Sequence, residues 1–227
     1  MPLSDGYWAV ENLLTRSISE PMHNKAPKEM RGLVNELAFI AFCSAIAVSR
    51  TLTRDAIRNA ITDAIPSAVG YINRVSSAEP VTVQDVDETC IRESAQLVLR
   101  LLSFCPTGTS VKIRPKFSGC GMIAACEGDL IVGDCLYEIK AGDRPFRISD
   151  LRQLLTYSAL AFASGNLTFN RLGLFNPRTG KVWVRSIDHV CHAVSGQRAN
   201  DVLSRVVEHM GDVPLPVEPS RAAAPHS

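Results

Sequence analysis

The stretch GDLIVGDCLYEIKAG, residues 128–142, places Asp129, Glu138 and Lys140 in a largely apolar sequence. It contains Gly133 followed by Asp134, and glycine followed by a polar residue is typical of the II′ turn of a two-residue β-hairpin. With these two residues as the turn, the strands pair so that Asp129 lies directly opposite Glu138. The sequence therefore predicts a hairpin that carries two opposed carboxylates at its open end.

Alternation of side chains along each strand gives this hairpin two faces. One face is apolar and is expected to be the core face: Leu130, Val132, Cys135, Tyr137 and Ile139. The other is apolar near the turn and charged at the far end: Asp129, Ile131, Leu136, Glu138 and Lys140. Like charges placed directly opposite each other destabilise a sheet. Lys140 supplies one positive charge, and two carboxylates at this separation also suit Mg²⁺ or Mn²⁺. The alternative is a solvent-exposed face with a local ion pair, which contributes less than about 1 kcal/mol.

The composition is that of a folded globular protein, with 227 residues of which 46% are hydrophobic. The first twenty residues lack a secretory signal, and the longest apolar stretch, 37–48, is too short to span a bilayer. We therefore expect a cytoplasmic protein that does not contact a membrane.

The seven cysteines include no CxxC pair, which argues against a zinc ribbon or a disulfide framework.

The charge distribution is uneven, although the formal net charge is only +1. Residues 111–185 hold eleven Lys and Arg against six Asp and Glu, a local net charge of +5, and the rest of the chain has a net charge of −4. The basic excess therefore lies on the segment that holds the opening stretch, which favours nucleic acid as a partner.

Apolar residues at helical spacing predict three helices in the first half of the chain, over about 28–50, 53–65 and 85–104. Thr53 is expected to cap the second helix and Pro66 to end it. Asp85 and Glu88 have the spacing of a capping box for the third helix. Residues 1–27 are expected to be an irregular N-terminal segment.

From residue 105 the apolar period changes from 3.6 to 2, which predicts strands over 111–117, 123–132 and 135–141. A helix capped by Ser149 or Asp150, a hairpin around 176–180 and a last helix broken near Gly196 follow. Pro115 favours an edge position for the first strand. We expect one domain over 28–210 and a disordered tail over 211–227. The domain would comprise a helical part (28–104), an αβ core (105–190) and a C-terminal helix (191–210).

The combination of Asp129, then Glu138-Ile139-Lys140, then Gln153 and Tyr157 four residues apart resembles the PD-(D/E)XK nuclease superfamily, and more closely its RecB-like branch with the QxxxY motif. The resemblance covers about residues 111–185, with Gly128 where the superfamily's name has proline. It implies an α/β fold with a restriction-endonuclease-like core, a mixed central sheet flanked by helices, here with an N-terminal helical elaboration.

The resemblance also implies roles for individual residues. Asp129 and Glu138 would bind a catalytic Mg²⁺ or Mn²⁺ together with the backbone carbonyl of Ile139, and Lys140 would position the attacking water. Gln153 and Tyr157 would face the active site or the nucleic-acid backbone. These roles suit phosphodiester hydrolysis, which needs a metal to polarise the phosphoryl oxygen and a cation near the developing negative charge.

Members of the superfamily often add an acidic residue from an earlier helix. Glu36 is our candidate for this further metal contact, because it interrupts an apolar helix face, and Glu93 is the competitor. Basic residues around the motif are candidate phosphate contacts: Lys112, Arg114, Lys116, Arg144, Arg147, Arg152 and Arg178. We expect Lys112, Arg114 and Lys116 to share one strand face. A merely solvated basic face is the alternative.

Three functions are compatible with these residues. The first is a metal-dependent nuclease that cleaves DNA, and the second is an RNA-directed nuclease, because the chemistry at the phosphate is shared. The third is a non-catalytic nucleic-acid-binding or scaffold subunit on the same fold, since fold does not fix function. A homodimer or a partner subunit is compatible with each of them.

Overall fold

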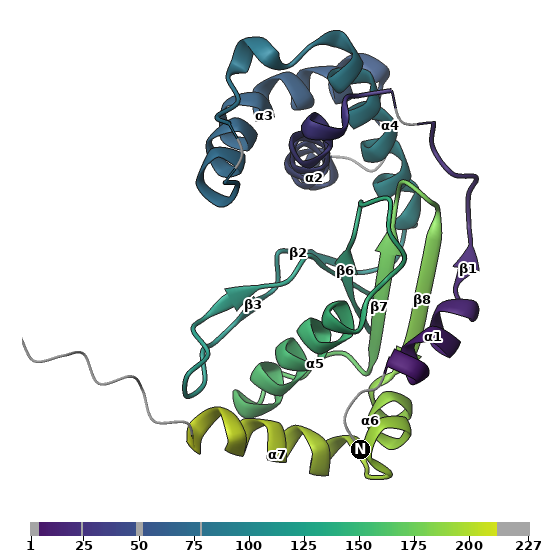
Figure 1. The fold of residues 1–227 in the computed structure, drawn as a ribbon, viewed down its shortest axis with the longest axis vertical. Coiled ribbons are helices and arrows are strands. Elements are labelled where there is room, and N and C mark those ends of the chain that lie inside the picture. The colour runs from purple at the N-terminus through teal and green to yellow at the C-terminus, as the bar shows by residue number, and fades with distance from the viewer. Residues whose placement is uncertain (1–4, 24, 49–51, 78, 213–227) are drawn as a thin grey trace, which may run out of the picture.

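The computed structural model describes residues 5–23, 25–48, 52–77 and 79–212, so residues 213–227 of the tail expected over 211–227 lie outside them. The chain folds into a mixed α/β structure whose six-stranded mixed sheet has helices on both faces (Figure 1). The strand order, with bounds, is β1 (Arg16–Ser17), β8 (Lys181–Ser186), β7 (Arg171–Asn176), β6 (Cys135–Ile139), β5 (Leu130–Val132) and β2 (Val111–Ile113). A separate two-stranded sheet pairs β3 (Lys116–Phe117) with β4 (Cys126–Glu127).

The predicted hairpin is confirmed, with its register. Leu130 pairs with Tyr137, and Val132 pairs with Cys135, in the antiparallel ladder of β5 and β6. Gly133 has φ +61°, as the first central residue of a II′ turn requires. The edge position predicted from Pro115 is also confirmed, because β2 ends one side of the sheet.

One parallel pair determines the topology around the candidate site. β6 and β7 run parallel, and the connection between them contains helix α5 (Ile148–Ala163). Parallel neighbours require such a crossover, which brings α5 back across one face of the sheet. The helix therefore begins shortly after the end of β6, next to the charged residues of that strand.

The first half of the chain forms a helical layer that lies above β7 and β8 in Figure 1, with α4 running down toward the sheet. Its elements are a 3₁₀ turn η1 (Lys28–Met30), α2 (Arg31–Val48), α3 (Arg54–Val75), a second 3₁₀ turn η2 (Val83–Asp85) and α4 (Glu88–Phe104). Buried residues of α2, α3 and α4 share one apolar core with Leu130, Phe175 and Val182 of the sheet. The helical half and the sheet are thus packed together.

Helix α3 corrects the predicted end at Pro66, because it continues to Val75. Thr53 caps it as predicted, its hydroxyl accepting a hydrogen bond from the Ala56 N–H. Proline removes one helical hydrogen bond, but Pro66 is exposed and Ala68 and Val69 beyond it are buried. Burial of this second half of the apolar stripe outweighs the missing bond.

The opposite face of the sheet is covered as well, which corrects the expectation of a single core face. Ile131 and Leu136 pack with α5, α6 (Ile187–Ser195) and α7 (Ala199–Asp212) in a second apolar core. The break at Gly196 is confirmed by its left-handed φ of +72°. The sheet is a middle layer, so the charged residues at the end of the hairpin lie between two layers of helices.

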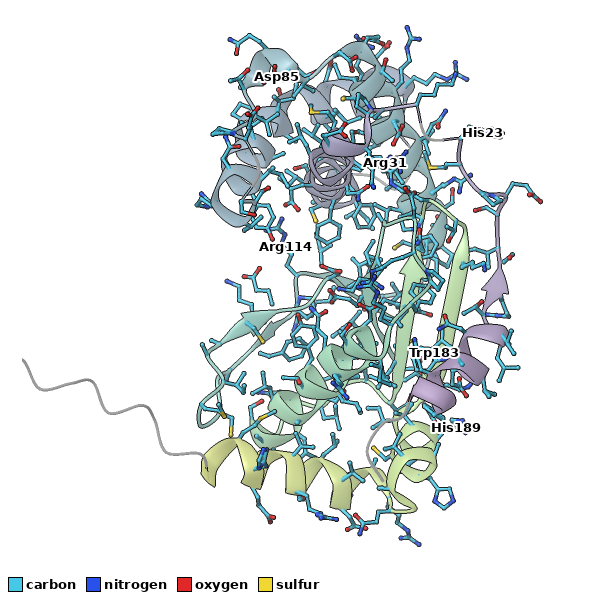
Figure 2. The ribbon with its side chains drawn as sticks, viewed as in Figure 1. His23, Arg31, Asp85, Arg114, Trp183 and His189 are labelled. Carbon is cyan, nitrogen blue, oxygen red and sulfur yellow. The ribbon has the colours of Figure 1, made fainter. Side chains whose placement is uncertain are left out.

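The first 27 residues are not irregular throughout, because Asp5–Leu13 form helix α1. Trp8 packs edge-on against Trp183 at 5.3 Å between ring centroids, and the Trp183 indole N–H donates to Glu11 (Figure 2 labels Trp183). Two aromatic rings supply the buried area that keeps this short helix on the sheet. The absence of a long apolar period hid the helix at the sequence level.

Two predicted caps are displaced by two or three residues. Asp87, not Asp85, caps α4 by accepting from the Cys90 N–H. Helix α5 begins after Arg147, whose N–H donates to the Asp150 carboxylate at 2.8 Å, so neither Ser149 nor Asp150 is the capping residue. At the end of the chain, α7 extends through Gly211 and Asp212, which were predicted to belong to the tail.

By length and composition alone, one helical segment among the described residues, Lys28–Val48, could cross a membrane. It contains the apolar stretch 37–48, extended to 21 residues by the rest of the helix and the turn before it. However, Leu33, Val34 and Leu37 of this segment are buried against neighbouring helices. A core helix of a soluble protein has the same composition.

Candidate functional site

The two opposed carboxylates lie at the open end of the β5–β6 hairpin, as predicted. Asp129 precedes β5, and its Oδ2 accepts a hydrogen bond of 2.7 Å from the Ile139 N–H across the hairpin. Its own carbonyl accepts from the Arg114 N–H at 2.9 Å. Glu138 is 6% exposed, and its Oε2 is buried without a hydrogen-bond partner in the described part of the chain. Such an unpaired buried oxygen is costly, and it marks the place where a cation would be stabilised.

Lys140, Gln153 and Tyr157 form a chain of hydrogen bonds that starts at Glu138. The Lys140 ammonium donates to Glu138 Oε1 and to Gln153 Oε1, both at 2.9 Å. The Gln153 amide then donates to the Tyr157 hydroxyl at 2.7 Å. Gln153 and Tyr157 therefore face the site and not solvent. The tyrosine ring is buried and stacks on Phe117 at 5.0 Å, so it holds the glutamine that orients the lysine.

The carboxylates of the site are difficult to ionise together. Burial, followed by the Asp129 carboxylate, raises the pKa of Glu138 to about 7, although Lys140 and Gln153 act in the opposite direction. Burial and the Glu36 carboxylate raise the pKa of Asp129, against the Ile139 N–H and Lys140. The site thus holds more carboxylate than its cations neutralise, which is the electrostatic condition for binding a divalent cation.

Glu36 reaches the same region from helix α2. A cleft of ≈ 340 Å³ between the helical layer and the sheet is lined by Glu36, Asp129, Ile139 and Lys140, among others. Burial raises the pKa of Glu36, against the Arg114 guanidinium. The structure therefore brings Glu36 to the cleft that contains Asp129.

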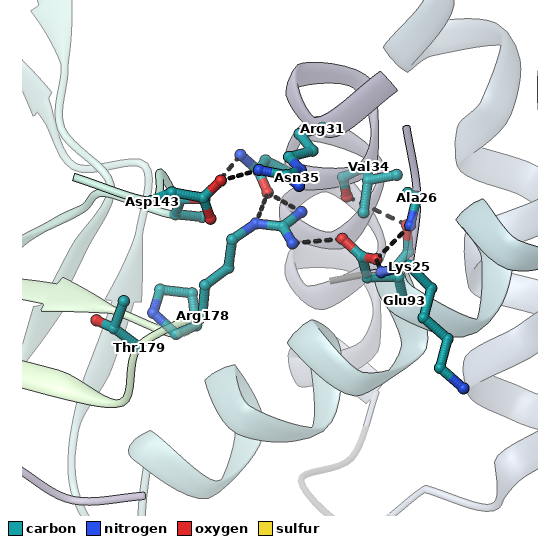
Figure 3. Close-up of polar contacts among 12 residues, drawn as sticks. Lys25, Ala26, Arg31, Val34, Asn35, Glu93, Asp143, Arg178 and Thr179 are labelled. Atoms are coloured by element: carbon teal, nitrogen blue, oxygen red, sulfur yellow. Dashed lines mark hydrogen bonds and ion pairs between the residues drawn. The ribbon is translucent and has the colours of Figure 1, made fainter. Parts of the chain in front are cut away.

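Glu93, the competing candidate, has a different position. It is 4% exposed, and its Oε2 accepts the Lys25 and Ala26 N–H groups at 2.8 and 2.9 Å. Its other oxygen pairs with Arg178 (Figure 3). These contacts occupy both carboxylate oxygens, so Glu93 belongs to a structural network away from the site.

The position predicted for Arg178 is wrong. It was expected to contact phosphate, but the residue is only 2% exposed. Its guanidinium pairs with Glu93 and donates to Asn35 Oδ1 from Nε at 2.9 Å and from Nη2 at 2.7 Å. Figure 3 shows Arg178 pointing from the β7–β8 hairpin to the helices. A buried arginine with these partners cannot reach a nucleic acid.

The same network holds helix α2 against the loop that follows Lys140. Asn35 Nδ2 donates to the Ala141 carbonyl at 3.0 Å, and Asn176 Nδ2 donates to the Gly142 carbonyl at 2.7 Å. Arg31 pairs with Asp143, the next residue along (Figure 3). Three consecutive loop residues are therefore each held by a side chain. Because Asn35 precedes Glu36, these bonds fix Glu36 relative to the end of β6.

Lys112, Arg114 and Lys116 do not share one strand face, as the alternation had predicted. Arg114 has a left-handed φ of +46° before Pro115, which breaks the alternation. Its guanidinium lies over the Phe39 ring of α2, 5.7 Å from the centroid, and Figure 2 shows Arg114 pointing to the helical layer. Lys112 and Lys116 line a different pocket, near the C-terminal end of α5 at Ala161. Only Arg114 of the three lies close to the carboxylates.

The remaining basic candidates surround the start of α5. Arg144 lines the cleft, and its guanidinium makes a bidentate pair with Asp150 at 2.8 and 2.9 Å. This pairing, with the Arg147 N–H, lowers the pKa of Asp150, although burial acts to raise it. Arg147 and Arg152 are exposed. All three can present positive charge near the site, with Arg144 the most constrained.

The donor set suits a hard divalent cation. Within the described ranges, no three Asp, Glu, His or Cys side chains form a group close enough to hold a metal by themselves. Mg²⁺ does not require such a group, because it is commonly held by one or two carboxylates with waters and substrate phosphate. Asp129 and Glu138, with the orphaned Oε2 of Glu138, meet that requirement.

Three residues that the sequence did not single out also contribute to this region: Asn35, Phe39 and Tyr71. Asn35 could have been noticed as the polar neighbour of Glu36 on an apolar helix. Tyr71 lies beyond Pro66, where the helix was expected to have ended, so its position could not be assigned.

No known family model matches the chain, and no curated protein shows significant sequence similarity to it.

Proposed function

We propose that this protein is a metal-dependent nuclease of the PD-(D/E)XK type, with a restriction-endonuclease-like core, that hydrolyses phosphodiester bonds in DNA. One observation carries the proposal: Glu138 Oε2 is buried and has no hydrogen-bond partner among the described residues, beside Asp129. The Lys140 ammonium donates to the other oxygen, Oε1. A buried carboxylate oxygen without a partner is costly in a purely structural site. A divalent cation would supply the missing partner.

Each residue has a role in this proposal. Asp129 and Glu138 would hold Mg²⁺ or Mn²⁺ together with the Ile139 carbonyl, and Glu36 would add negative charge from the opposite wall. When bound, the cation polarises the phosphoryl oxygen and lowers the pKa of a bound water. Lys140 orients the attacking water and stabilises the developing charge on the phosphate.

Gln153 and Tyr157 support Lys140 rather than contacting the reacting atoms. The Gln153 carbonyl accepts from the ammonium, and Tyr157 fixes the other end of the amide. This arrangement favours one position of a flexible four-carbon side chain. Arg114 and Arg144 are the proposed phosphate contacts. Arg144 lines the cleft, and the Arg114 guanidinium lies over the ring of Phe39, which is part of the cleft wall.

The setting proposed for this activity is the cytoplasm, with nucleic acid as the partner. The net charge of +5 over residues 111–185 supports attraction of a polyanion to this half of the chain. An RNA substrate would use the same phosphate chemistry, so the assay includes both nucleic acids.

The test is cleavage of labelled DNA and RNA with Mg²⁺ or Mn²⁺ by wild type, Lys140→Ala and Lys181→Ala. Lys181 is an exposed lysine on β8, and its removal controls for the loss of one positive charge. We expect Lys140→Ala to lower kcat by roughly 100-fold or more, and Lys181→Ala to have no such effect. No cleavage by wild type, or equal cleavage by Lys140→Ala, would contradict the proposal and favour a non-catalytic binding subunit.

A further inference from the structure

The helical wall of the cleft carries an exposed aromatic side chain. Tyr71 of α3 is 41% exposed and lines the cleft together with Phe39 and Ile72, across from the carboxylate-bearing strands. Large apolar side chains are usually turned inward, and this helix buries Ala68 and Val69 one turn earlier. The wall therefore presents an aromatic face to the same space as Asp129 and Lys140.

The position of Tyr71 follows from the length of α3. Since the helix continues nine residues past Pro66, to Val75, its last turns extend over the cleft. The Ile72 side chain lies near Gly32 of α2, where an added Cβ would be 3.8 Å from Ile72 Cδ1. Close packing of α2 and α3 at this point fixes the direction in which the preceding residue, Tyr71, faces.

Positive charge accompanies the aromatic wall. Lys140 and Arg144 line the cleft, and the Arg114 guanidinium lies 5.7 Å from the Phe39 ring centroid. Aromatic side chains next to cations are the combination with which proteins bind single-stranded nucleic acid, the rings stacking on bases and the cations following the phosphates. The volume of ≈ 340 Å³ is at the small end of ligand sites, of the order of one nucleotide unit.

We propose that Tyr71 stacks on an unpaired base next to the scissile phosphate, and that single-stranded nucleic acid is the preferred substrate. The proposal deepens the function given above and rests on it. A base within a duplex has both faces covered by its neighbours, so presenting one to Tyr71 requires unstacking and unpairing it. An unpaired strand presents its bases without that cost.

The experiment compares cleavage of one labelled DNA oligonucleotide, single-stranded or in a blunt duplex, in the presence of Mn²⁺. The variants are Tyr71→Ala, Tyr71→Leu and Tyr71→Phe, with Leu99→Ala as the control. Leu99 is a 46% exposed apolar residue of α4 outside this cleft. Tyr71→Leu keeps apolar bulk on the helix, so it separates loss of the ring from any loss of folding that Tyr71→Ala causes.

We expect wild type to cleave the single strand faster than the duplex. Tyr71→Ala and Tyr71→Leu should raise KM for the single strand by roughly 5-fold to 150-fold, as expected for the loss of one base–aromatic stack. Tyr71→Phe and Leu99→Ala should retain the wild-type KM. Preference for the blunt duplex, or an unchanged KM in Tyr71→Leu, would overturn the proposal while leaving the nuclease assignment intact.

Failure of the proposed function gives a different result. If wild type cleaves neither nucleic acid with Mg²⁺ or Mn²⁺, binding of the labelled single strand is measured by fluorescence anisotropy. Weaker binding by Tyr71→Leu than by Tyr71→Phe then supports the stacking site in a non-catalytic protein. Equal binding by the two variants overturns it.

Discussion

Replacing Arg178 with methionine tests whether the buried network joins the helical layer to the sheet. Arg178 and Glu93 have side-chain exposures of 1% and 3%, and the guanidinium also donates twice to Asn35. Methionine fills much of the same volume but provides no donor. The substitution therefore leaves the Glu93 carboxylate buried without its cation and Asn35 Oδ1 without its two donors.

The expected cost can be placed within the range for breaking a buried ion pair, about 3–5 kcal/mol. Glu93 retains the N–H groups of Lys25 and Ala26, so the lower end of that range applies. Although burial acts to raise it, these bonds and Arg178 together lower the pKa of Glu93, which favours the ionised carboxylate. We expect Arg178→Met to lower the free energy of unfolding by about 3 kcal/mol.

Urea unfolding followed by circular dichroism measures this change, with an expected midpoint shift of roughly 1 M for a chain of this size. Adding Glu93→Gln to Arg178→Met should recover part of the loss, because the buried charge is then removed. Arg171→Met is the control, since the pair between Arg171 and Asp134 is 48% and 49% exposed and contributes less than about 1 kcal/mol. Equal effects of Arg178→Met and Arg171→Met would show that the buried pair contributes no more to stability than an exposed pair.

Four further substitutions test the packing and electrostatics of the fold. Glu138→Gln should stabilise the metal-free protein by up to about 3 kcal/mol above pH 7, because the raised pKa of Glu138 makes its ionisation unfavourable for folding. The gain should vanish below pH 4.5, the ordinary pKa of the side chain. Urea unfolding at a series of pH values measures this change. Asp150→Asn should lower the free energy of unfolding by about 2 kcal/mol at neutral pH. Because folding lowers the pKa of Asp150, this difference from wild type should shrink as the pH falls through 3.8 and below it. A difference that does not change with pH would exclude the Asp150 charge as its cause. Gly173→Ala should lower the melting temperature and destabilise the protein by about 2–3 kcal/mol, because the added Cβ would lie 2.2 Å from the Tyr137 ring. Gly70→Ala should instead stabilise helix α3 by about 0.5–1 kcal/mol, because its added Cβ would have no atom within 4 Å. Similar effects of the two glycine substitutions would mean that the Tyr137 ring is not closely packed.

Local sequence chemistry was sufficient for the hairpin that carries the site. Gly133 determines the turn and thereby the register, and Pro115 predicts the edge. Because pairing is decided within fifteen residues, it depends little on the rest of the chain. The resemblance implied only that Gln153 would face the active site or the nucleic-acid backbone, and its hydrogen bond with Lys140 was not predicted.

Long-range contacts determined what the sequence pattern could not predict. Arg178 looks like a surface turn residue, and only the approach of Glu93 and Asn35 from distant helices makes it a core residue. Similarly, the left-handed φ of Arg114 overrides strand alternation. Continuation of α3 past Pro66 depends on burial against α2, which local propensity does not encode.

The central claim is that Asp129 and Glu138 together hold a divalent cation. Anomalous diffraction from crystals soaked in Mn²⁺ tests it most directly. We expect one anomalous peak between the two carboxylates, with Glu138 Oε2 as a ligand at about 2.1 Å, and loss of this peak in Glu138→Gln. No peak within coordination distance of either carboxylate, or an unchanged peak in Glu138→Gln, would contradict the account.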